Sequence, residues 1–142
     1  MKTRTFAGRF LVALALAAAL PATAIAAAPA APSSARPAWA ALPARLDEKR
    51  LAALLADKSS GILLLDVRTA EEFAAGRIPG ALLHPYDGIE TSFREPDKSR
   101  PIVVYCRSGR RSAIAAESLR RMGYSNVSDF GGLDRWSGKL ER

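Results

Sequence analysis

The chain has 142 residues, which is enough for one domain and a short additional segment. It contains 21 Lys and Arg against 14 Asp and Glu, but no long basic stretch with interleaved aromatic residues, so the charge does not indicate a nucleic-acid-binding protein. One cysteine and one histidine cannot make a closed zinc site, and we expect neither a metal nor another cofactor.

The N-terminus predicts an export signal. Residues 1–9 carry three basic residues and no acidic one, residues 10–20 are wholly apolar, and residues 22–26 supply the small residues of a cleavage site after Pro21. We therefore expect a signal peptide over residues 1–26, with an uncleaved membrane anchor as the less favoured alternative because the apolar run is short. Cleavage would leave 18 basic and 14 acidic residues, a net charge of +4, on an exported, periplasmic protein without stable membrane association.

Residues 27–44 are rich in alanine and proline and predict a linker, in which Trp39 could pack on the domain that follows. The domain is expected over residues 45–142. Its first helix should begin after Asp47, a favourable N-cap, and end before the turn residues 58–61.

The later elements alternate between strands and helices. Residues 62–67 and 102–105 are continuous apolar runs, which predict strands covered on both faces of a parallel sheet. The alternation predicts an α/β domain with three layers around a mostly parallel, five-stranded sheet. The other expected segments are strands at residues 81–83 and 127–130 and helices at residues 69–76 (opened by a capping box of Thr69 and Glu72), 89–95, 112–122 and 133–136.

Cys106, the only cysteine, marks the candidate active site. It lies between an apolar strand and the next helix, at the end of a strand where parallel α/β folds bind their ligands. Backbone N–H groups of this loop, the positive end of the helix and the charges of Arg107, Arg110 and Arg111 should favour a bound anion and the nucleophilic thiolate. A small buried core residue is the alternative for a lone cysteine, but the loop sequence favours a reactive, anion-binding one.

Asp66 ends the other buried strand, so we expect it at the same edge of the sheet as Cys106. Arg68 should support this loop and is within reach of a pair with Glu72. Arg111 has three roles that the sequence leaves open: it could bind the anion, cap the helix or pair with Asp66.

Several other residues fit structural roles. His84 is interpreted as a loop or sheet-edge histidine rather than a catalytic base, since nothing in the sequence places it near Cys106. Trp136 is interpreted as a packing residue rather than a ligand contact. Gly131 and Gly132 mark a turn where the backbone adopts a positive φ or approaches another group closely.

Four motifs, in order over residues 45–140, resemble those of single-domain rhodaneses, and the preceding signal peptide resembles the exported type. The chain departs from the pattern at Arg77, where the family often has histidine. The motifs are DVR at 66–68 followed by EEF at 71–73, GRIPGA at 76–81, VYCRSGRRS at 104–112 and GGLDRW at 131–136.

The resemblance implies a thiosulfate sulfurtransferase. In such enzymes the loop cysteine attacks the sulfane sulfur of thiosulfate or a similar anionic donor, sulfite leaves, and the persulfide passes its outer sulfur to cyanide or a thiol. It implies Cys106 as the nucleophile and sulfur carrier, with Asp66 and Arg68 as structural support. The substrate-binding residues that it implies are Arg107, Ser108, Gly109, Arg110 and Arg111.

Two other functions share part of this pattern. Cysteine phosphatases and arsenate reductases resemble rhodaneses in this loop, but the related phosphatases usually have five residues between Cys and Arg, whereas four separate Cys106 from Arg111. A persulfide carrier or binding module that serves a partner protein, with little turnover of small substrates, is the alternative from another functional class.

Overall fold

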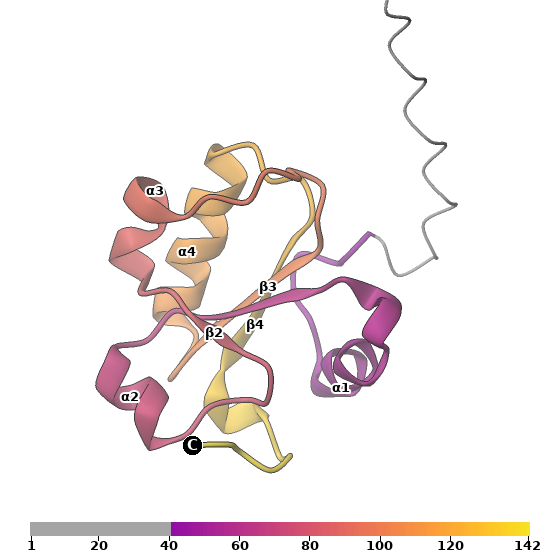
Figure 1. The fold of residues 1–142 in the computed structure, drawn as a ribbon, viewed down its shortest axis with the longest axis vertical. Helices are drawn as coiled ribbons and strands as arrows, with labels where there is room; N and C mark the ends of the chain where they lie inside the picture. The colour runs from indigo at the N-terminus through magenta and orange to yellow at the C-terminus, as the bar shows by residue number, and fades with distance from the viewer. Residues whose placement is uncertain (1–40) are drawn as a thin grey trace, which may run out of the picture. The chain divides into compact units, whose positions relative to one another are not determined.

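The computed structural model describes residues 41–142 (Figure 1). The signal peptide predicted for residues 1–26, most of the predicted linker and Trp39 lie outside the described residues. Within residues 41–142, no helix combines the length and the apolar character needed to cross a bilayer. The helices and strands, in chain order, are α1 (Glu48–Ala56), β1 (Leu63–Asp66), α2 (Ala70–Ala75), β2 (Leu82–Leu83), α3 (Ile89–Ser92), β3 (Ile102–Cys106), α4 (Arg110–Arg121) and β4 (Val127–Gly132).

The described residues form a parallel sheet of four strands in the order β2-β1-β3-β4. The prediction of a five-stranded sheet is therefore wrong for this part of the chain. The segment before α1 makes only one parallel bridge to β4, between Arg45 and Asp129, with the Leu46 N–H donating to Asp129 O at 3.1 Å. This segment adds no full strand because the chain turns directly into α1 at its N-cap, Asp47.

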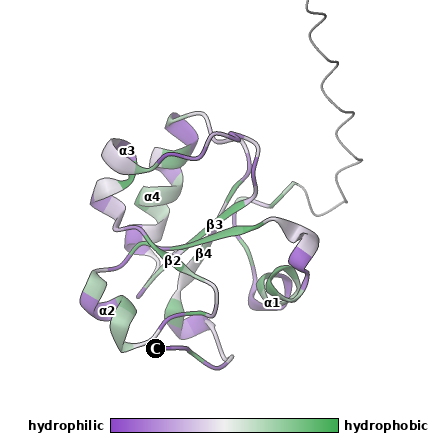
Figure 2. Ribbon diagram, in the orientation of Figure 1, coloured by the Kyte–Doolittle hydropathy of each residue, from purple (hydrophilic) through white to green (hydrophobic). Residues whose placement is uncertain are grey.

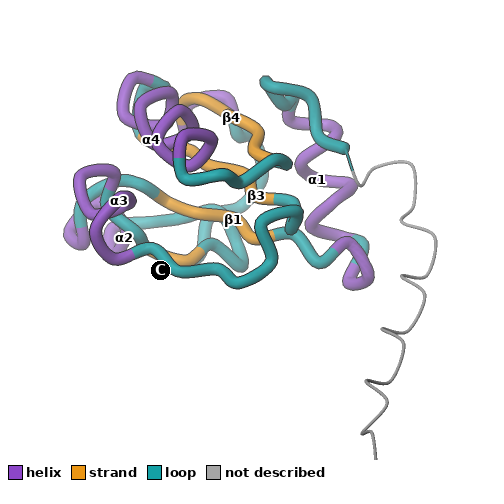
Figure 3. The backbone as a smooth tube through the Cα atoms, turned by 90° about the horizontal axis from the view of Figure 1, so that it is seen from above, coloured by secondary structure: helices purple, strands orange, loops and turns teal. Residues whose placement is uncertain are grey.

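The sheet is the middle of three layers, with α3 and α4 on one face and α1 on the other (Figures 1 and 3). Apolar residues run along the strands, and polar residues lie on the outer helical surfaces (Figure 2). Successive side chains of β1 and β3 alternate between two separate hydrophobic clusters, as a strand requires. The cluster beneath α3 and α4 includes Leu65, Val104, Cys106 and Leu119, and the cluster beneath α1 includes Leu51, Leu64, Tyr105 and Phe130.

Side-chain caps begin the first two α-helices where the sequence predicts them. Asp47 Oδ1 accepts the Arg50 N–H at 2.8 Å at the start of α1. Thr69 and Glu72 form the predicted capping box of α2. Helix α4 begins at Arg110, two residues before the predicted start, because Gly109 reverses the chain with a φ of +93°.

The end of β4 packs directly against the loop that follows Cys106. The strand continues to Gly132, beyond the predicted end at Phe130, and a register shift brings Gly132 beside Cys106. Gly131 has a φ of +94°, and a Cβ placed on Gly132 would lie 2.9 Å from Arg107 O. These observations confirm the prediction of a positive φ or a close backbone approach at this turn, and the glycine pair shows both.

Candidate active site

Cys106 is the last residue of β3 and has no exposed surface. Its Sγ accepts a hydrogen bond from the Gly109 N–H at 3.1 Å, and Ser112 Oγ lies 3.8 Å from the sulfur. The loop therefore folds back over the sulfur and directs main-chain donors at it before α4 begins. The N–H groups thus lie where the sequence predicts an anion-holding loop, and the binding of an anion stays a prediction.

Ser112 holds this loop in place, a role that the sequence analysis did not assign to it. The side chain is buried, and its hydroxyl donates to Gly109 O at 3.0 Å and lies 3.3 Å from Gly131 O. The Ser112 hydroxyl thus connects the start of α4 to Gly109, where the loop reverses direction, and to Gly131 near the end of β4. A small hydroxyl residue three positions after a loop glycine was the sequence feature that could have indicated this anchor.

The surroundings of Cys106 favour its thiolate. Burial is the largest single influence and on its own would raise the pKa of the thiol. The backbone N–H groups of Ser112, Ser108 and Gly109, together with the Ser112 hydroxyl, outweigh burial, so the pKa of Cys106 is lowered from its ordinary value. The charge that the sulfur develops is stabilised mainly by main-chain donors.

The three loop arginines fall into two groups. Arg107 and Arg110 are exposed, and within residues 41–142 their side chains make no ion pair or hydrogen bond. Arg111 is partly buried and makes a bidentate pair with Glu72, at 2.6 and 2.8 Å. Of the roles left open for Arg111, pairing with Asp66 is therefore wrong, as is the suggested pair between Arg68 and Glu72.

Glu72 links α2 to α4. Its carboxylate accepts a hydrogen bond from the Thr69 N–H at 3.2 Å within the capping box. It also accepts hydrogen bonds from both terminal nitrogens of Arg111. The hydrogen bonds from Arg111 are the main reason why the pKa of Glu72 is lowered to about 2. The pKa of Arg111 is raised, first by its hydrogen bonds to Glu72 and to a smaller extent by the charges of Glu72 and Cys106, against the opposing effect of burial.

Asp66 and Arg68 form a separate buried network on the side of the sheet that α1 covers. Arg68 Nη2 donates to Asp66 Oδ2 at 2.6 Å and to Gly76 O at 2.7 Å. Burial alone would lower the pKa of Arg68, but the hydrogen bonds and charge of Asp66 raise it. Tyr105 belongs to the same network: its hydroxyl accepts the Ile78 N–H at 3.1 Å, and burial followed by the Asp66 carboxylate raises its pKa. The network supports the loop after α2 and does not contact Cys106.

A cavity of about 300 Å³ opens between the loops that follow β1 and β2. Arg111, in the first turn of the helix that follows the Cys106 loop, forms part of its wall. Tyr86 and Val67 also line it and pack in the same hydrophobic cluster as Cys106. The remaining lining residues are Arg68, Thr69, Ala70, Pro85 and Asp87.

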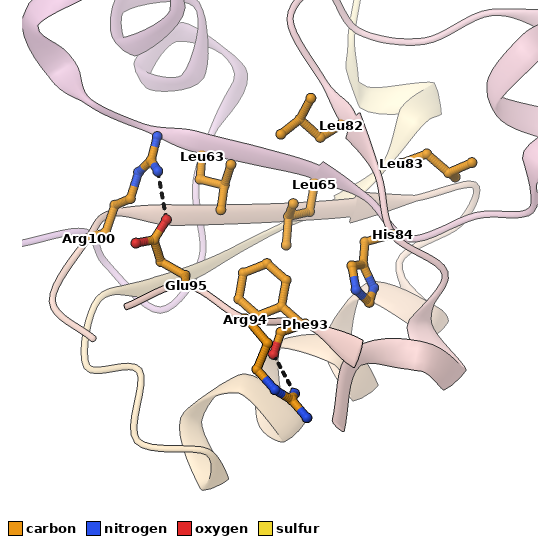
Figure 4. Close-up of a pocket in the computed structure, with 9 residues that line it drawn as sticks. All are labelled: Leu63, Leu65, Leu82, Leu83, His84, Phe93, Arg94, Glu95 and Arg100. Atoms are coloured by element: carbon orange, nitrogen blue, oxygen red, sulfur yellow. Dashed lines mark hydrogen bonds and ion pairs between the residues drawn. The ribbon is translucent and has the colours of Figure 1, made fainter. Parts of the chain in front are cut away.

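His84 lies directly after the edge strand β2 and lines a different pocket (Figure 4). Its ring packs edge-on against Phe93 with 5.4 Å between the centroids, and its Nε2 lies 3.3 Å from Ser92 Oγ. Strand β1 separates β2 from β3, so the histidine is not brought to Cys106. Trp136 also fits its predicted packing role, since its ring packs edge-to-face with Phe130 in the cluster beneath α1.

A parallel α/β domain with a buried cysteine at the end of its central strand, cradled by amide groups, defines a thiolate-dependent class of protein. Comparison of the sequence with models of known protein families identifies the family. A family model described as "Rhodanese-like domain" matches residues 47–139, which is more than half of the chain. The chain therefore belongs to the rhodanese-like sulfurtransferase family.

The chain is similar to several named sulfurtransferases. It is 41% identical over 93 residues to a sulfurtransferase of Allochromatium vinosum, covering 65% of this chain and 86% of that protein. It is 37% identical over 71 residues to the thiosulfate sulfurtransferase PspE of Escherichia coli, covering 49% of this chain and 68% of PspE. Among solved structures, the human single-domain sulfurtransferase TSTD1 matches with a TM-score of 0.54 and 32% identity, covering 63% of this chain and 90% of that one.

One relative carries a different name. The putative sulfur carrier protein YrkF of Bacillus subtilis is 34% identical over 86 residues, covering 60% of this chain. The chain spans 46% of the length of YrkF, so the comparison concerns only part of that protein.

Proposed function

We propose that the protein is a thiosulfate sulfurtransferase that works through a persulfide on Cys106. The observation that carries the proposal is the 3.1 Å hydrogen bond from the Gly109 N–H to Cys106 Sγ, in a buried loop at the start of α4. A thiolate held in this way is a ready nucleophile and needs no separate base. The named activity of PspE supports thiosulfate as the donor.

In the first half-reaction the Cys106 thiolate attacks the outer sulfur of thiosulfate. A sulfur–sulfur bond forms to the cysteine, the sulfur–sulfur bond of thiosulfate breaks, and sulfite leaves with the bonding electron pair. The total charge is conserved, because a monoanion and a dianion give the persulfide monoanion and the sulfite dianion. The exposed, unpaired Arg107 and Arg110 would attract the dianionic donor and stabilise the departing sulfite.

In the second half-reaction an acceptor attacks the outer sulfur of the persulfide. The outer sulfur bonds to the acceptor, so cyanide becomes thiocyanate and a thiol becomes a persulfide. The sulfur–sulfur bond to Cys106 breaks, and its electron pair regenerates the Cys106 thiolate. The N–H groups of Ser108, Gly109 and Ser112, which lower the pKa of the thiol, would also stabilise the charge on the outer sulfur.

The direct test is intact mass measurement of the purified chain after incubation with thiosulfate. We expect a gain of about 32 Da, one sulfur atom, that cyanide removes with release of thiocyanate, as a covalent intermediate requires. Cys106→Ser is the matched control, since it replaces sulfur by oxygen with little change in shape. A mass gain of equal size in Cys106→Ser would overturn the assignment of the nucleophile.

Two further assays, steady-state turnover with acceptors and hydrolysis of a phosphomonoester, separate the two alternatives. A persulfide that forms but does not turn over with cyanide or small thiols would favour the sulfur carrier, which the similarity to YrkF supports. Hydrolysis of a phosphomonoester without sulfur transfer would favour the phosphatase.

We also propose that the protein works outside the cytoplasm, on the basis of the predicted signal peptide. An exported thiol protein is then a more suitable acceptor than glutathione. Expression of the full chain, followed by cell fractionation and mass measurement, tests this: the exported form should be found in the periplasm and should lack residues 1–26.

A further inference from the structure

The positive charges around Cys106 are not all available to a ligand. Arg111 is held by both oxygens of Glu72, and Arg68 is held by both oxygens of Asp66. Of the cations near the cysteine loop, the exposed Arg107 and Arg110 have no partner within residues 41–142. The free positive charge therefore lies in the loop itself, outside the neighbouring cavity.

The cavity of about 300 Å³ between the loops after β1 and β2 has the opposite character. Its two cationic lining residues, Arg68 and Arg111, are the paired ones. Its one acidic lining residue, Asp87, is exposed and makes no ion pair in the part of the chain that the structure describes. The cavity thus offers no free cation and one free carboxylate to a molecule that enters between these two loops.

Glu72 produces this division of charge, and its position is fixed. The capping box holds one oxygen to the Thr69 N–H at 3.2 Å, and the same carboxylate holds Arg111 at 2.6 Å. Only about a quarter of the Glu72 side chain and a fifth of the Arg111 side chain are exposed, so water screens the pair less than it screens a surface pair. Without Glu72, the Arg111 guanidinium would stand as an uncompensated charge in the cavity wall.

We propose that Glu72 is a specificity-determining, positioning residue. By neutralising Arg111 it makes the cavity a site for the uncharged or amine-bearing part of an acceptor that carries a thiol, and it leaves anion recognition to Arg107 and Arg110. The assignment of the cavity to an acceptor rests on the proposed function of Cys106. An anionic acceptor placed there would be repelled by the persulfide and by Asp87, with no free cation to offset this.

Glu72→Gln tests the charge without removing the cap, because the glutamine carbonyl can still accept the Thr69 N–H. We compare three acceptors of similar size that differ in charge: cysteamine, 2-mercaptoethanol and thioglycolate. The wild-type chain should prefer cysteamine to thioglycolate as acceptor. Glu72→Gln should raise the ratio of kcat/KM for thioglycolate to kcat/KM for cysteamine by about fivefold. This is the effect expected when the charge of the partly buried Arg111 is no longer neutralised.

A second measurement does not depend on sulfur transfer. The rate ratio for alkylation of Cys106 by anionic iodoacetate against neutral iodoacetamide reports the local potential, and Glu72→Gln should raise this ratio by about fivefold as well. If no variant accepts sulfur from thiosulfate, the proposed function fails alone, and the alkylation ratio still decides whether Glu72 controls the charge.

Two further variants exclude a structural effect. Glu71→Gln removes the same charge from an exposed neighbour that does not contact Arg111, and both ratios should stay within about twofold of wild type. The double variant Glu72→Gln with Arg111→Gln removes the uncovered cation and should return both ratios toward wild type. Unchanged ratios in a folded Glu72→Gln, or no return in the double variant, would overturn the proposal.

Discussion

Asp66 and Cys106 end neighbouring central strands, yet their side chains lie on opposite faces of the sheet. Asp66 is in register with Tyr105, whose side chain packs beneath α1, whereas the Cys106 side chain packs beneath α4. The two residues therefore share an edge of the sheet but not a site. The proposed nucleophile therefore lies on one face, and the buried ion pair of Asp66 and Arg68 lies on the other.

This separation predicts that Asp66→Asn harms stability more than it harms the thiol. The variant leaves the Arg68 charge buried with only the Gly76 carbonyl and a neutral amide, which should lower the free energy of unfolding by about 3–5 kcal/mol. Urea unfolding measures this change, with the exposed Asp87→Asn as a control expected within about 0.5 kcal/mol of wild type. Comparable unfolding of the two variants would mean that the Asp66–Arg68 pair contributes little.

The alkylation rate of Cys106 should depend on pH as expected for a thiol whose pKa lies below its ordinary value. The rate with iodoacetamide should reach its plateau at lower pH than the rate of a cysteine peptide, because the loop amides stabilise the thiolate. A pH series of pseudo-first-order rates gives both midpoints. A midpoint at or above that of the peptide would mean that burial outweighs the amides.

Stability should also depend on Glu72 in a defined pH range. The folded pKa of about 2 lies below the ordinary 4.5, so the pair with Arg111 stabilises the fold above pH 4.5, and this contribution is lost as the pH falls toward 2. Wild type should exceed Glu72→Gln by about 1 kcal/mol near pH 6, and the difference should vanish near pH 2. Urea unfolding at a series of pH values measures this difference in the free energy of unfolding between wild type and Glu72→Gln. A difference that does not change with pH would exclude the ion pair as its cause.

Gly132→Ala should disturb the cysteine loop from outside it. The added Cβ would lie 2.9 Å from Arg107 O and even closer to Asp134 Oδ1, so the backbone must shift at the point where β4 supports the loop. We expect a loss of about 1–3 kcal/mol in the free energy of unfolding and slower alkylation of Cys106. Gly88→Ala is the matched control, because its nearest contact would be an ordinary 3.4 Å and its φ is negative.

Replacing Arg107 or Arg110 by alanine should weaken the use of thiosulfate and spare the neutral reagent iodoacetamide. Each side chain is exposed and unpaired within residues 41–142, so its loss should raise the KM for the dianion by about three- to tenfold. Arg50→Ala removes an equal charge from α1 on the other side of the sheet and should leave KM unchanged. Unchanged KM in both loop variants would show that these side chains do not meet the donor.

Local sequence patterns predict those features of the structure that depend on neighbouring residues in the chain. The caps at Asp47 and Thr69 and the two buried strands depend on residues within one turn or one strand, and the sequence predicts them correctly. The partner of Arg111 could not be predicted, because the pair with Glu72 joins residues 39 positions apart through the packing of two helices. The missing fifth strand has a similar cause, since a single bridge to Asp129 depends on how the chain enters α1.

The donors that surround the Cys106 sulfur belong largely to the main chain, and every residue type except proline supplies the same group. We therefore expect the side chains at positions 107, 108 and 110 to tolerate variation while the main-chain donors around the sulfur are retained. A library randomised at these three positions should yield many active proteins with altered donor preference, and laboratory evolution could redirect this loop toward new sulfur compounds without rebuilding its chemistry.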